Sequence, residues 1–243
     1  MSDVPALPVP RLVLWRHGRT EWNAAGRFQG QLDPPLDEVG RRQARRAAPH
    51  LAAPLPEGTL VVSSDLGRAA ETAVALTDVL GVPLRLDPRL REVDMGSWEG
   101  LTRQEVAERH PEQYADWLAG RPITGRGGED SADVPARALA ALRDLPEAPA
   151  AVVVTHGGTS ARLIEALLGL GPEHRRVFGP LANCAWSELA EQSGRWRLLR
   201  HNTSAPDLPD GPVPPPQPGT RRPDAGASPE EGAPGPPQDA DAL

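Results

Sequence analysis

Residues 12–18 read LVLWRHG, and this stretch decides how the rest of the 243-residue chain is interpreted. Four consecutive apolar residues are typical of a strand that is buried on both faces of a parallel sheet. The run stops at Arg16 and His17, so the strand would deliver two polar side chains to its carboxyl end. In open α/β sheets, ligands bind at the carboxyl ends of the strands. We therefore expect a strand over residues 12–15 and a functional site directly after it.

Two further apolar runs end in the same way. Residues 60–64 read LVVSS and lead to Arg68, and residues 151–154 read AVVV and lead to His156. The carboxyl ends of neighbouring parallel strands meet at one edge of a sheet. The sequence therefore predicts a single site that combines these residues with the Arg-His pair of the first strand.

Helical patterns separate the predicted strands. Asp37 can cap a helix over residues 38–53, Gly81 can close one over 67–80, and the T-R-Q-E capping box at 102–105 can open another. The remaining expected elements are a short strand over 82–86, helices over 112–119, 134–145 and 159–168, and a terminal hairpin with strands over 184–189 and 196–200. Strands that alternate with helices predict an α/β fold, a three-layer α/β/α sandwich with a mostly parallel central sheet and helices on both faces.

The composition changes at Pro206. Residues 206–243 hold twelve of the 29 prolines and no aromatic residue. Such a segment cannot bury enough apolar surface to offset the entropy of ordering it. We therefore expect a catalytic domain over residues 1–205 and a disordered, acidic, Pro-rich tail over 206–243. The P-x-x-P spacing within 212–218 is recognised by some binding modules, but a solvated linker is the simpler interpretation.

Charge and composition argue against several classes of function. The net charge of −7 comes mainly from the tail, which holds seven acidic residues and two arginines, so the folded part is close to neutral. A near-neutral domain argues against general nucleic-acid binding, which needs a basic face. The amino terminus has no signal-peptide pattern, and no apolar run is long enough to span a bilayer. The single cysteine, Cys184, fits a reducing compartment. We expect a cytoplasmic protein that binds neither nucleic acid nor a membrane.

The residues after the first strand point to a known family. The RHG tripeptide continues as RTEWN at 19–23 and RFQG at 27–30. With these residues the chain resembles the histidine phosphatase superfamily, the phosphoglycerate-mutase-like group, whose signature is R-H-G-x-T-x-W-N. Four later stretches agree in the same order: RFQGQLDPPLDEVGRRQA, SSDLGRAAETA, LREVDMGSWEGL and VVVTHGG. The resemblance covers residues 11–205 and implies a phosphoryl-transfer enzyme.

The predicted phosphate-binding residues follow from the charge of a phosphate monoester, which is a dianion. The forked guanidinium groups of Arg16 and Arg68 can donate to its non-bridging oxygens in a geometry that lysine does not reproduce. Gly18 would let the backbone approach the anion closely. The resemblance implies further substrate contacts from the neutral side chains and backbone of Asn23, Gln29, Gly30 and Gly157, and from His156.

His17 is the predicted nucleophile, as the resemblance implies. It must attack phosphorus as neutral imidazole, so its other ring nitrogen should donate to a fixed acceptor, and a backbone carbonyl is expected. The attack would form a phosphohistidine that water then cleaves. His156 would stabilise the charge of the transferring phosphoryl group.

Glu92 is the predicted general acid because it occupies the position of the family's proton donor. It must hold a proton near neutral pH, which burial or neighbouring carboxylates would favour. Asp94 and Glu99 are the alternative acids. We expect no cofactor and no metal site, because the histidines lack ligand spacing and the resembled family needs no metal.

Three functions are compatible with these residues: a small-molecule phosphatase, a mutase that needs a bisphosphorylated primer, and a non-catalytic protein that binds phosphorylated ligands. The stretch after Glu92, VDMGSWEG, has the phosphatase form in place of the E-R-H-Y-G-like stretch of mutases. The complete set of Arg16, His17, Arg68, Glu92 and His156 argues against a binding protein. Structurally, an exposed Arg-His pair after an edge strand is the alternative interpretation of the tripeptide.

Within the phosphatases, the chain is most similar to the actinobacterial glucosyl-3-phosphoglycerate phosphatases, also in the late stretches NCAWSEL and RWRL. Such a substrate carries a carboxylate beside its phosphate, and Arg27, Arg103 and Arg126 are candidate cations for it. All 26 basic residues are arginine, so each of these assignments is weak by itself. Other metabolite esters are alternative substrates, and specificity is expected to be set within the cap region 94–130. The resemblance also makes a homodimer an expectation.

Overall fold

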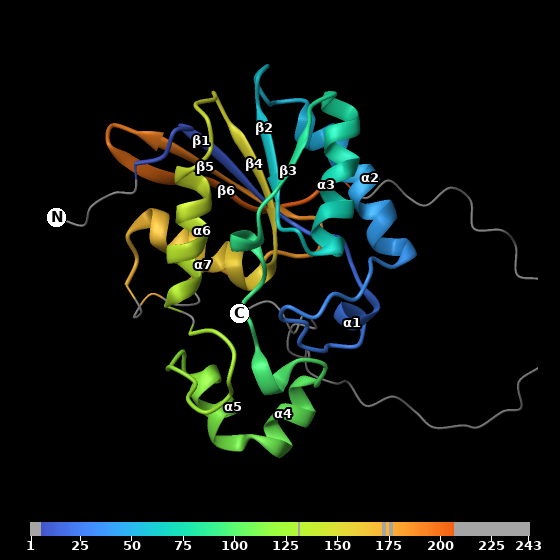
Figure 1. Ribbon diagram of the computed structural model, residues 1–243, viewed down its shortest axis with the longest axis vertical. Coiled ribbons are helices and arrows are strands. Elements are labelled where there is room, and N and C mark those ends of the chain that lie inside the picture. Colours follow the sequence, from blue (N-terminus) through green and yellow to red (C-terminus); the bar gives the residue numbers. More distant parts are fainter. Residues whose placement is uncertain (1–5, 131, 172–173, 175–176, 207–243) are drawn as a thin grey trace, which may run out of the picture. The chain divides into compact units, whose positions relative to one another are not determined.

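The computed structural model describes residues 6–130, 132–171, 174 and 177–206 (Figure 1). The chain divides into two units, and the described elements all belong to the first, whose described part ends at Ala205. The second unit is Pro206–Pro237. The tail predicted over 206–243 lies outside the described residues except for Pro206, so its order stays a prediction.

The described strands form a six-stranded mixed sheet in the order β3-β2-β4-β1-β5-β6. They are β1 (Arg11–Arg16), β2 (Leu60–Ser63), β3 (Leu84–Leu86), β4 (Ala151–Thr155), β5 (Trp186–Gln192) and β6 (Arg195–Thr203). Strands β1 to β4 run parallel to one another, whereas β5 and β6 pair antiparallel. Because β4 lies between β1 and β2, the three predicted polar strand ends lie side by side at one edge of the sheet.

Helices cover both faces of this sheet. They are α2 (Glu38–Ala52) and α3 (Gly67–Leu80) on one face, and α6 (Asp133–Arg143) and α7 (Gly157–Leu168) on the other. Figure 1 shows each pair lying together, with α2 and α3 on the right and α6 and α7 on the left. The predicted three-layer α/β/α sandwich is confirmed.

Alternation along β1 explains the two cores. Successive side chains of a strand point to opposite faces. Accordingly Leu12 and Leu14 lie in the core beneath α6 and α7, whereas Val13 and Trp15 lie in the core beneath α2 and α3. All four are at most 2% exposed. The apolar run of this strand is therefore what joins the two halves of the sandwich.

The predicted helix ends are confirmed where short-range chemistry sets them. The Asp37 side chain accepts from the N–H of Gly40, and Gly81 closes α3 in the left-handed conformation at φ 67°. The capping box of Thr102 and Glu105 opens α4 (Arg103–Arg109). The hairpin differs from its prediction because β5 begins at Trp186, after Cys184 turns the chain at φ 58°.

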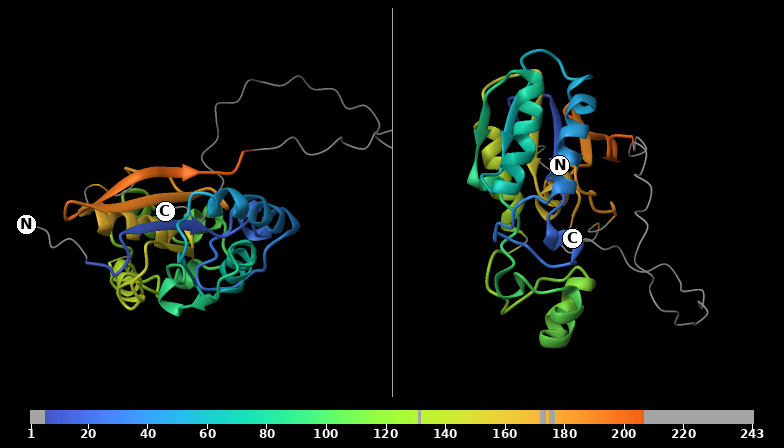
Figure 2. Two further views of the ribbon diagram at one scale, coloured as in Figure 1. Left: turned by 90° about the horizontal axis from the view of Figure 1, so that it is seen from above. Right: turned by 90° about the vertical axis from the view of Figure 1, so that its right-hand side faces the viewer.

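A smaller cap lies beyond the strand ends. It contains the one-turn helix η2 (Gly96–Trp98), α4 and α5 (Pro111–Leu118). Figures 1 and 2 show α4 and α5 set apart from the sheet, below it in Figure 1. Phe28, Trp98 and Trp117 form the centre of its own apolar cluster, with ring centroids 5.3 to 6.2 Å apart. This cluster fixes the cap as a packed unit over the carboxyl edge.

Among the described helices, none combines the length and the apolar character that crossing a bilayer requires.

Candidate active site

The register between β1 and β4 places the two predicted histidines side by side. Arg16 pairs with Thr155 across the two parallel strands, so His17 and His156 follow at equivalent positions. The N–H of His17 donates to the carbonyl of Thr155 at 3.0 Å. The imidazole centroids lie 5.1 Å apart, and both side chains are fully buried.

The tautomer of His17 is fixed by a backbone carbonyl. Its Nδ1 lies 2.7 Å from the carbonyl oxygen of Gly18, which can only accept, so Nδ1 carries the proton. Burial lowers the pKa of the His17 imidazole well below its ordinary value, and the positive charges of Arg68 and Arg16 lower it further. The neutral ring therefore presents the lone pair of Nε2, and the predicted backbone acceptor is confirmed.

His156 is buried among the same cations. Burial lowers its pKa well below the ordinary value, followed by the charges of Arg68, His17, Arg16 and Arg137. Within the part of the chain that the structure describes, neither ring nitrogen of His156 has a hydrogen-bond partner, nor has Nε2 of His17. Buried polar atoms are ordinarily paired. Unpaired nitrogens on two adjacent imidazoles therefore mark a place for a polar ligand.

Backbone carbonyls hold the two predicted phosphate-binding arginines. Arg16 donates from Nη1 to the carbonyl of Leu181 at 2.6 Å. Arg68 donates from Nη1 to Leu32 at 2.7 Å and from Nη2 to Gly30 at 2.8 Å. Both side chains are fully buried. Arg68 Nη1 also pairs with Asp33 Oδ1 at 3.4 Å. A guanidinium has five N–H donors in a planar fork, a geometry that matches the oxygens of a phosphate.

Glu92 reaches the same edge from the segment that follows β3. Its carboxylate accepts the N–H groups of Gly158 and Thr159 at 2.9 Å each, at the start of α7, and the N–H of Val93 at 2.9 Å. His156, the residue before α7, makes no side-chain cap bond, so Glu92 supplies the cap. Burial or neighbouring carboxylates were expected around Glu92: the side chain is buried, at 2% exposure, and these contacts are with N–H donors.

The two alternative acids hold the cap together. Oε1 of Glu99 accepts the N–H groups of Gln31 and Met95, at 2.9 and 3.1 Å. Asp94 accepts the N–H of Gly96 at 2.9 Å. Since the carboxylates of Glu99 and Asp94 bind the loops of the cap, Glu92 is the carboxyl that lies against α7 beside His156.

Close packing explains why positions 18 and 30 are glycine. The N–H of Gly18 donates to Thr72 Oγ1 at 3.0 Å, and a Cβ there would meet the carbonyl oxygen of Gly40 at 2.6 Å. Gly18 therefore permits close packing against α2, and its N–H is used within the protein and not by an anion. Gly30 has φ 53°, and a Cβ there would meet Glu99 Oε1 at 2.0 Å.

Thr20, which the sequence reasoning missed, organises the two predicted neutral donors. Its hydroxyl lies 3.1 Å from Asn23 Oδ1 and 3.0 Å from Gln29 Oε1, so the oxygens of both amides face Thr20. Asn183, also missed, donates from Nδ2 to the carbonyl of His17 and to Asn23 Oδ1, each at 3.2 Å. Thr20 was visible as the fourth specified letter of the family signature, whereas no local pattern gave Asn183 a role in the site.

The three arginines predicted to serve a substrate carboxylate have other partners. Arg27 donates to the carbonyl of Gly100 at 2.7 Å and pairs with Glu105 at 3.1 Å. Arg103 lies over the ring of Trp117, 5.3 Å from its centroid. Arg126 is 7% exposed and donates to the carbonyls of Asp94 and Glu129. All three side chains thus have partners within the cap, and their role toward a substrate carboxylate stays a prediction.

A thiolate nucleophile and a metal centre are two other kinds of site that the described residues can be checked for. Cys184 is buried, and burial raises the pKa of its thiol, which argues against a thiolate nucleophile. Among the described residues, no group of three or more His, Cys, Asp or Glu side chains could hold a metal ion. The arrangement thus offers a neutral imidazole nucleophile, a second imidazole, two guanidinium groups and one carboxyl, which together suit an anionic group that accepts a nucleophile.

The comparisons with known proteins agree with this chemistry. Residues 12–204 match the family described as the histidine phosphatase superfamily (branch 1). A glucosyl-3-phosphoglycerate phosphatase of Mycolicibacterium vanbaalenii is 41% identical over 219 residues, which cover 81% of this chain and 96% of that protein. A probable phosphoglycerate mutase of Yersinia pestis is 38% identical over 195 residues, which cover 76% and 87%.

A solved structure is similar over the same region. A mycobacterial glucosyl-3-phosphoglycerate phosphatase in complex with VO3 aligns with a TM-score of 0.70 at 39% identity. The alignment covers 80% of this chain and 100% of that chain.

Proposed function

The chain belongs to the histidine phosphatase superfamily and is a phosphatase, and we propose that it hydrolyses glucosyl-3-phosphoglycerate with His17 as nucleophile. The observation that carries the nucleophile is the bond of Nδ1 to the Gly18 carbonyl, because it leaves the reactive lone pair on Nε2. The substrate is supported by the 41% identity to the Mycolicibacterium vanbaalenii phosphatase named for this ester.

In the first half of the proposed reaction, Arg16 and Arg68 bind the non-bridging oxygens of the phosphate and neutralise its charge. Nε2 of His17 attacks the phosphorus, and the bond from phosphorus to the ester oxygen breaks. Glu92 gives its proton to that oxygen, which leaves as an alcohol. The three backbone N–H groups that Glu92 accepts suit its carboxylate form, so the mechanism requires the bound phosphate dianion to bring the proton onto Glu92, because two negative charges repel each other.

In the second half, a water molecule attacks the phosphorus of the phosphohistidine. Glu92, now a carboxylate, takes a proton from the water, and the bond between phosphorus and Nε2 breaks. Inorganic phosphate leaves and His17 returns to its neutral form. His156 lies on the other side of the phosphoryl group and stabilises its charge in both halves, while the amides of Asn23 and Gln29 donate to its oxygens.

The sugar-acid ester is a demanding substrate for this chemistry. Its leaving group is an alkoxide, which departs slowly unless it is protonated. Hydrolysis of this ester therefore depends on the proton that Glu92 donates. The carboxylate of the ester requires a cationic partner, and Arg27, Arg103 and Arg126, which have contacts within the cap, stay the predicted candidates. Arg126 is buried and donates to the carbonyls of Asp94 and Glu129, and these contacts hold the 126–129 loop against the rest of the cap.

A substrate panel tests the proposal. The purified chain is assayed for release of inorganic phosphate from glucosyl-3-phosphoglycerate, 3-phosphoglycerate and other sugar phosphates, with and without 2,3-bisphosphoglycerate as primer. The highest kcat/KM is expected for glucosyl-3-phosphoglycerate, independent of primer. Isomerisation of 3-phosphoglycerate without release of phosphate would instead identify a mutase, as named for the Yersinia relative. Equal turnover of every ester would refute the proposed substrate.

Two expectations stay predictions from the sequence. A homodimer rests on the family resemblance, and sedimentation velocity on the purified chain would test it. A cytoplasmic location rests on the sequence composition.

A further inference from the structure

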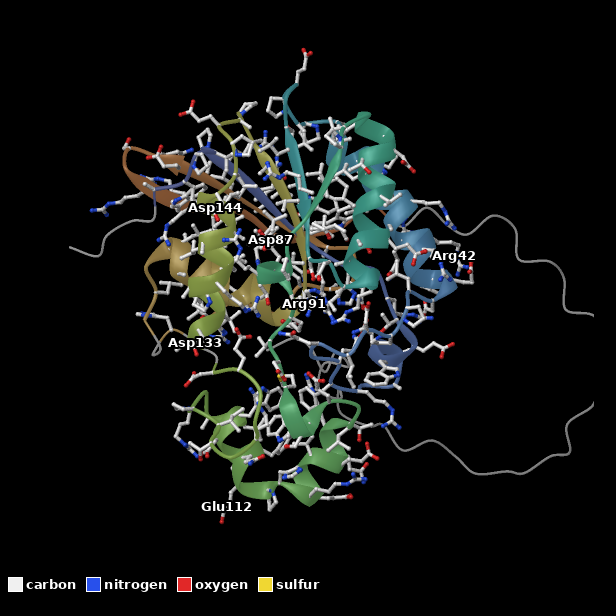
Figure 3. The ribbon with its side chains drawn as sticks, in the orientation of Figure 1. Arg42, Asp87, Arg91, Glu112, Asp133 and Asp144 are labelled. Atoms are coloured by element: carbon white, nitrogen blue, oxygen red, sulfur yellow. The ribbon has the colours of Figure 1, made fainter. Side chains whose placement is uncertain are left out.

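Side chains of neighbouring elements bind the backbone carbonyls of the segment that carries Glu92. It starts with the one-turn helix η1 (Pro88–Leu90) and continues as Arg91 and Glu92 without a regular partner strand. Figure 3 labels Asp87 and Arg91 at its two ends, beside helix α6, whose ends are marked by Asp133 and Asp144. An irregular segment needs other groups to satisfy its backbone carbonyls.

Four successive carbonyls in this segment accept hydrogen bonds from side chains. The carbonyl of Leu90 accepts from Thr155 Oγ1 at 2.7 Å, and that of Arg91 accepts from Thr159 Oγ1 at 2.8 Å. Arg137, from the middle of α6, donates to several of these carbonyls. Its guanidinium reaches the carbonyls of residues 89, 91 and 92.

The contacts of Arg137 are short and use both ends of its fork. Nη1 donates to the carbonyls of Arg89 and Arg91 at 2.6 and 2.8 Å, and Nη2 donates to the carbonyl of Glu92 at 3.1 Å. The opposite side of the guanidinium pairs with the carboxylate of Glu129, through Nε and Nη2. The planar fork is therefore held between an acid and three carbonyls, with its side chain only 19% exposed.

This arrangement transmits position to the Glu92 carboxyl. The backbone of Glu92 is fixed from α6 by Arg137, and its carboxyl group is fixed from α7 by the N–H groups of Gly158 and Thr159. A shift of the backbone would move the carboxyl away from the leaving oxygen, and misplacement by about 1 Å can lower a rate by about a hundredfold.

We propose that Arg137 is a positioning residue for general-acid catalysis, which it serves by holding the carbonyls of residues 89, 91 and 92. The inference rests on the proposed role of Glu92 as the acid. The hydrogen bonds of Arg137 go to these three carbonyls and to the carboxylate of Glu129. The charged fork cannot be replaced by lysine, because an ammonium group does not reach three carbonyls and a carboxylate in one plane.

The test uses the dependence of the rate on the leaving group. p-Nitrophenol leaves without help from an acid, whereas an alkyl alcohol needs its oxygen protonated. We compare the parent, Arg137→Ala, Arg137→Lys and Glu92→Gln on p-nitrophenyl phosphate and on glycerol 3-phosphate. Arg143→Ala is the matched control, since Arg143 lies on the same helix and is exposed. Urea unfolding checks that each variant is folded at the assay temperature.

The readout is kcat/KM, because it reports the steps up to departure of the alcohol and leaves out the hydrolysis of the phosphohistidine, which both esters share. Arg137→Ala is expected to lower kcat/KM on the alkyl ester by about tenfold to a hundredfold, part of the cost of losing the acid altogether. The loss of kcat/KM on p-nitrophenyl phosphate should be much smaller. Arg137→Lys should recover only part of kcat/KM on the alkyl ester, and Arg143→Ala should match the parent.

The outcomes separate the two proposals. Equal losses on both esters for Arg137→Ala would overturn the positioning role, because Arg137 would then act on the phosphate site as a whole. Equal losses on both esters for Glu92→Gln would overturn the role of Glu92 as the acid, whatever Arg137 does. If Glu92→Gln loses activity only on the alkyl ester and Arg137→Ala loses none, Glu92 remains the acid and the inference about Arg137 is refuted.

Discussion

The carboxylate of Glu92 accepts the backbone N–H of Gly158 at 2.9 Å and so caps helix α7 from 66 residues away in the chain. A helix amino terminus carries partial positive charge and unpaired N–H groups, and both suit a carboxylate. The predicted acid is thus bound to the helix that begins directly after the second active-site histidine. A shift of either Glu92 or the start of α7 would therefore strain the hydrogen bonds that join them.

Gly158→Ala should separate catalysis from folding. A Cβ at this position would meet Glu92 Oε1 at 2.8 Å and Val93 Cγ2 at 3.0 Å, so the carboxyl must shift. Alanine is otherwise favoured over glycine inside a helix, by about 1 kcal/mol. We expect kcat on an alkyl phosphate to fall about tenfold or more while the helix stays formed. Gly179→Ala is the control, since a Cβ at Gly179 would meet nothing within 4 Å. Unchanged kcat for Gly158→Ala would contradict the coupling.

Replacement of His17 by alanine should abolish the phosphoenzyme. Rapid quenching of the parent with 32P-labelled substrate in an alkaline denaturant should trap a phosphohistidine, which is stable in base and loses its label in acid. His17→Ala should show no label, and turnover should fall by about a thousandfold or more, as for other deleted nucleophiles. His50→Ala, which removes an exposed imidazole, should label like the parent. Label that persists in His17→Ala would show that another residue is the nucleophile.

The buried histidines should make stability depend on pH. Burial holds the pKa of both His17 and His156 below the ordinary value, so the unfolded chain binds more protons than the folded chain as the pH falls below about 6.5. Stability is therefore retained above this pH and lost below it, by at most about 1.4 kcal/mol per pH unit for each histidine.

The measurement for this prediction is urea unfolding between pH 7.5 and 5.0, within a range in which most carboxylates stay ionised. His156→Gln should lower the slope of the unfolding free energy against pH, because one buried imidazole no longer titrates. The same slope in parent and variant would mean that His156 is not protonated preferentially in the unfolded chain.

Gly30→Ala should destabilise the chain more than strain alone explains. Gly30 has φ 53°, and a Cβ there would meet Glu99 Oε1 at 2.0 Å, whereas Gly81 has φ 67° with nothing within 4 Å. Left-handed strain costs alanine about 1–2 kcal/mol at either position. The clash with Glu99 should add about 1–3 kcal/mol at Gly30. Thermal unfolding of both variants measures the difference, and equal losses would rule out the contact.

Truncation after Pro206 tests the predicted domain boundary. The Pro-rich composition of residues 207–243 predicts that they add little to the core, so the truncated chain should keep its kcat/KM and its unfolding free energy within about 0.5 kcal/mol. Assay and urea unfolding of the two lengths check this. A large loss of activity would show that the tail contributes to the site.

The predictions that the structure confirms depend on interactions between residues close together in the sequence. The apolar run before Arg16 and His17 requires a buried strand, and the parallel arrangement then places His156 beside His17. The caps at Asp37 and Gly81 depend on residues a few positions away. The partners of Arg27, Arg103 and Arg126 within the cap could not be predicted, because the partner of a long side chain is set by the tertiary fold and spacing along the chain does not reveal it.

The sequence by itself determined the strand ends, the alternating helices and the chemical types gathered at one edge, because backbone periodicity and caps are local properties. Only the tertiary structure decided that Glu92, and neither Asp94 nor Glu99, lies against α7 beside His156. It also decided that Arg137 holds the backbone of that acid. Both contacts join residues far apart in the chain, and their geometry depends on how the helices pack on the sheet.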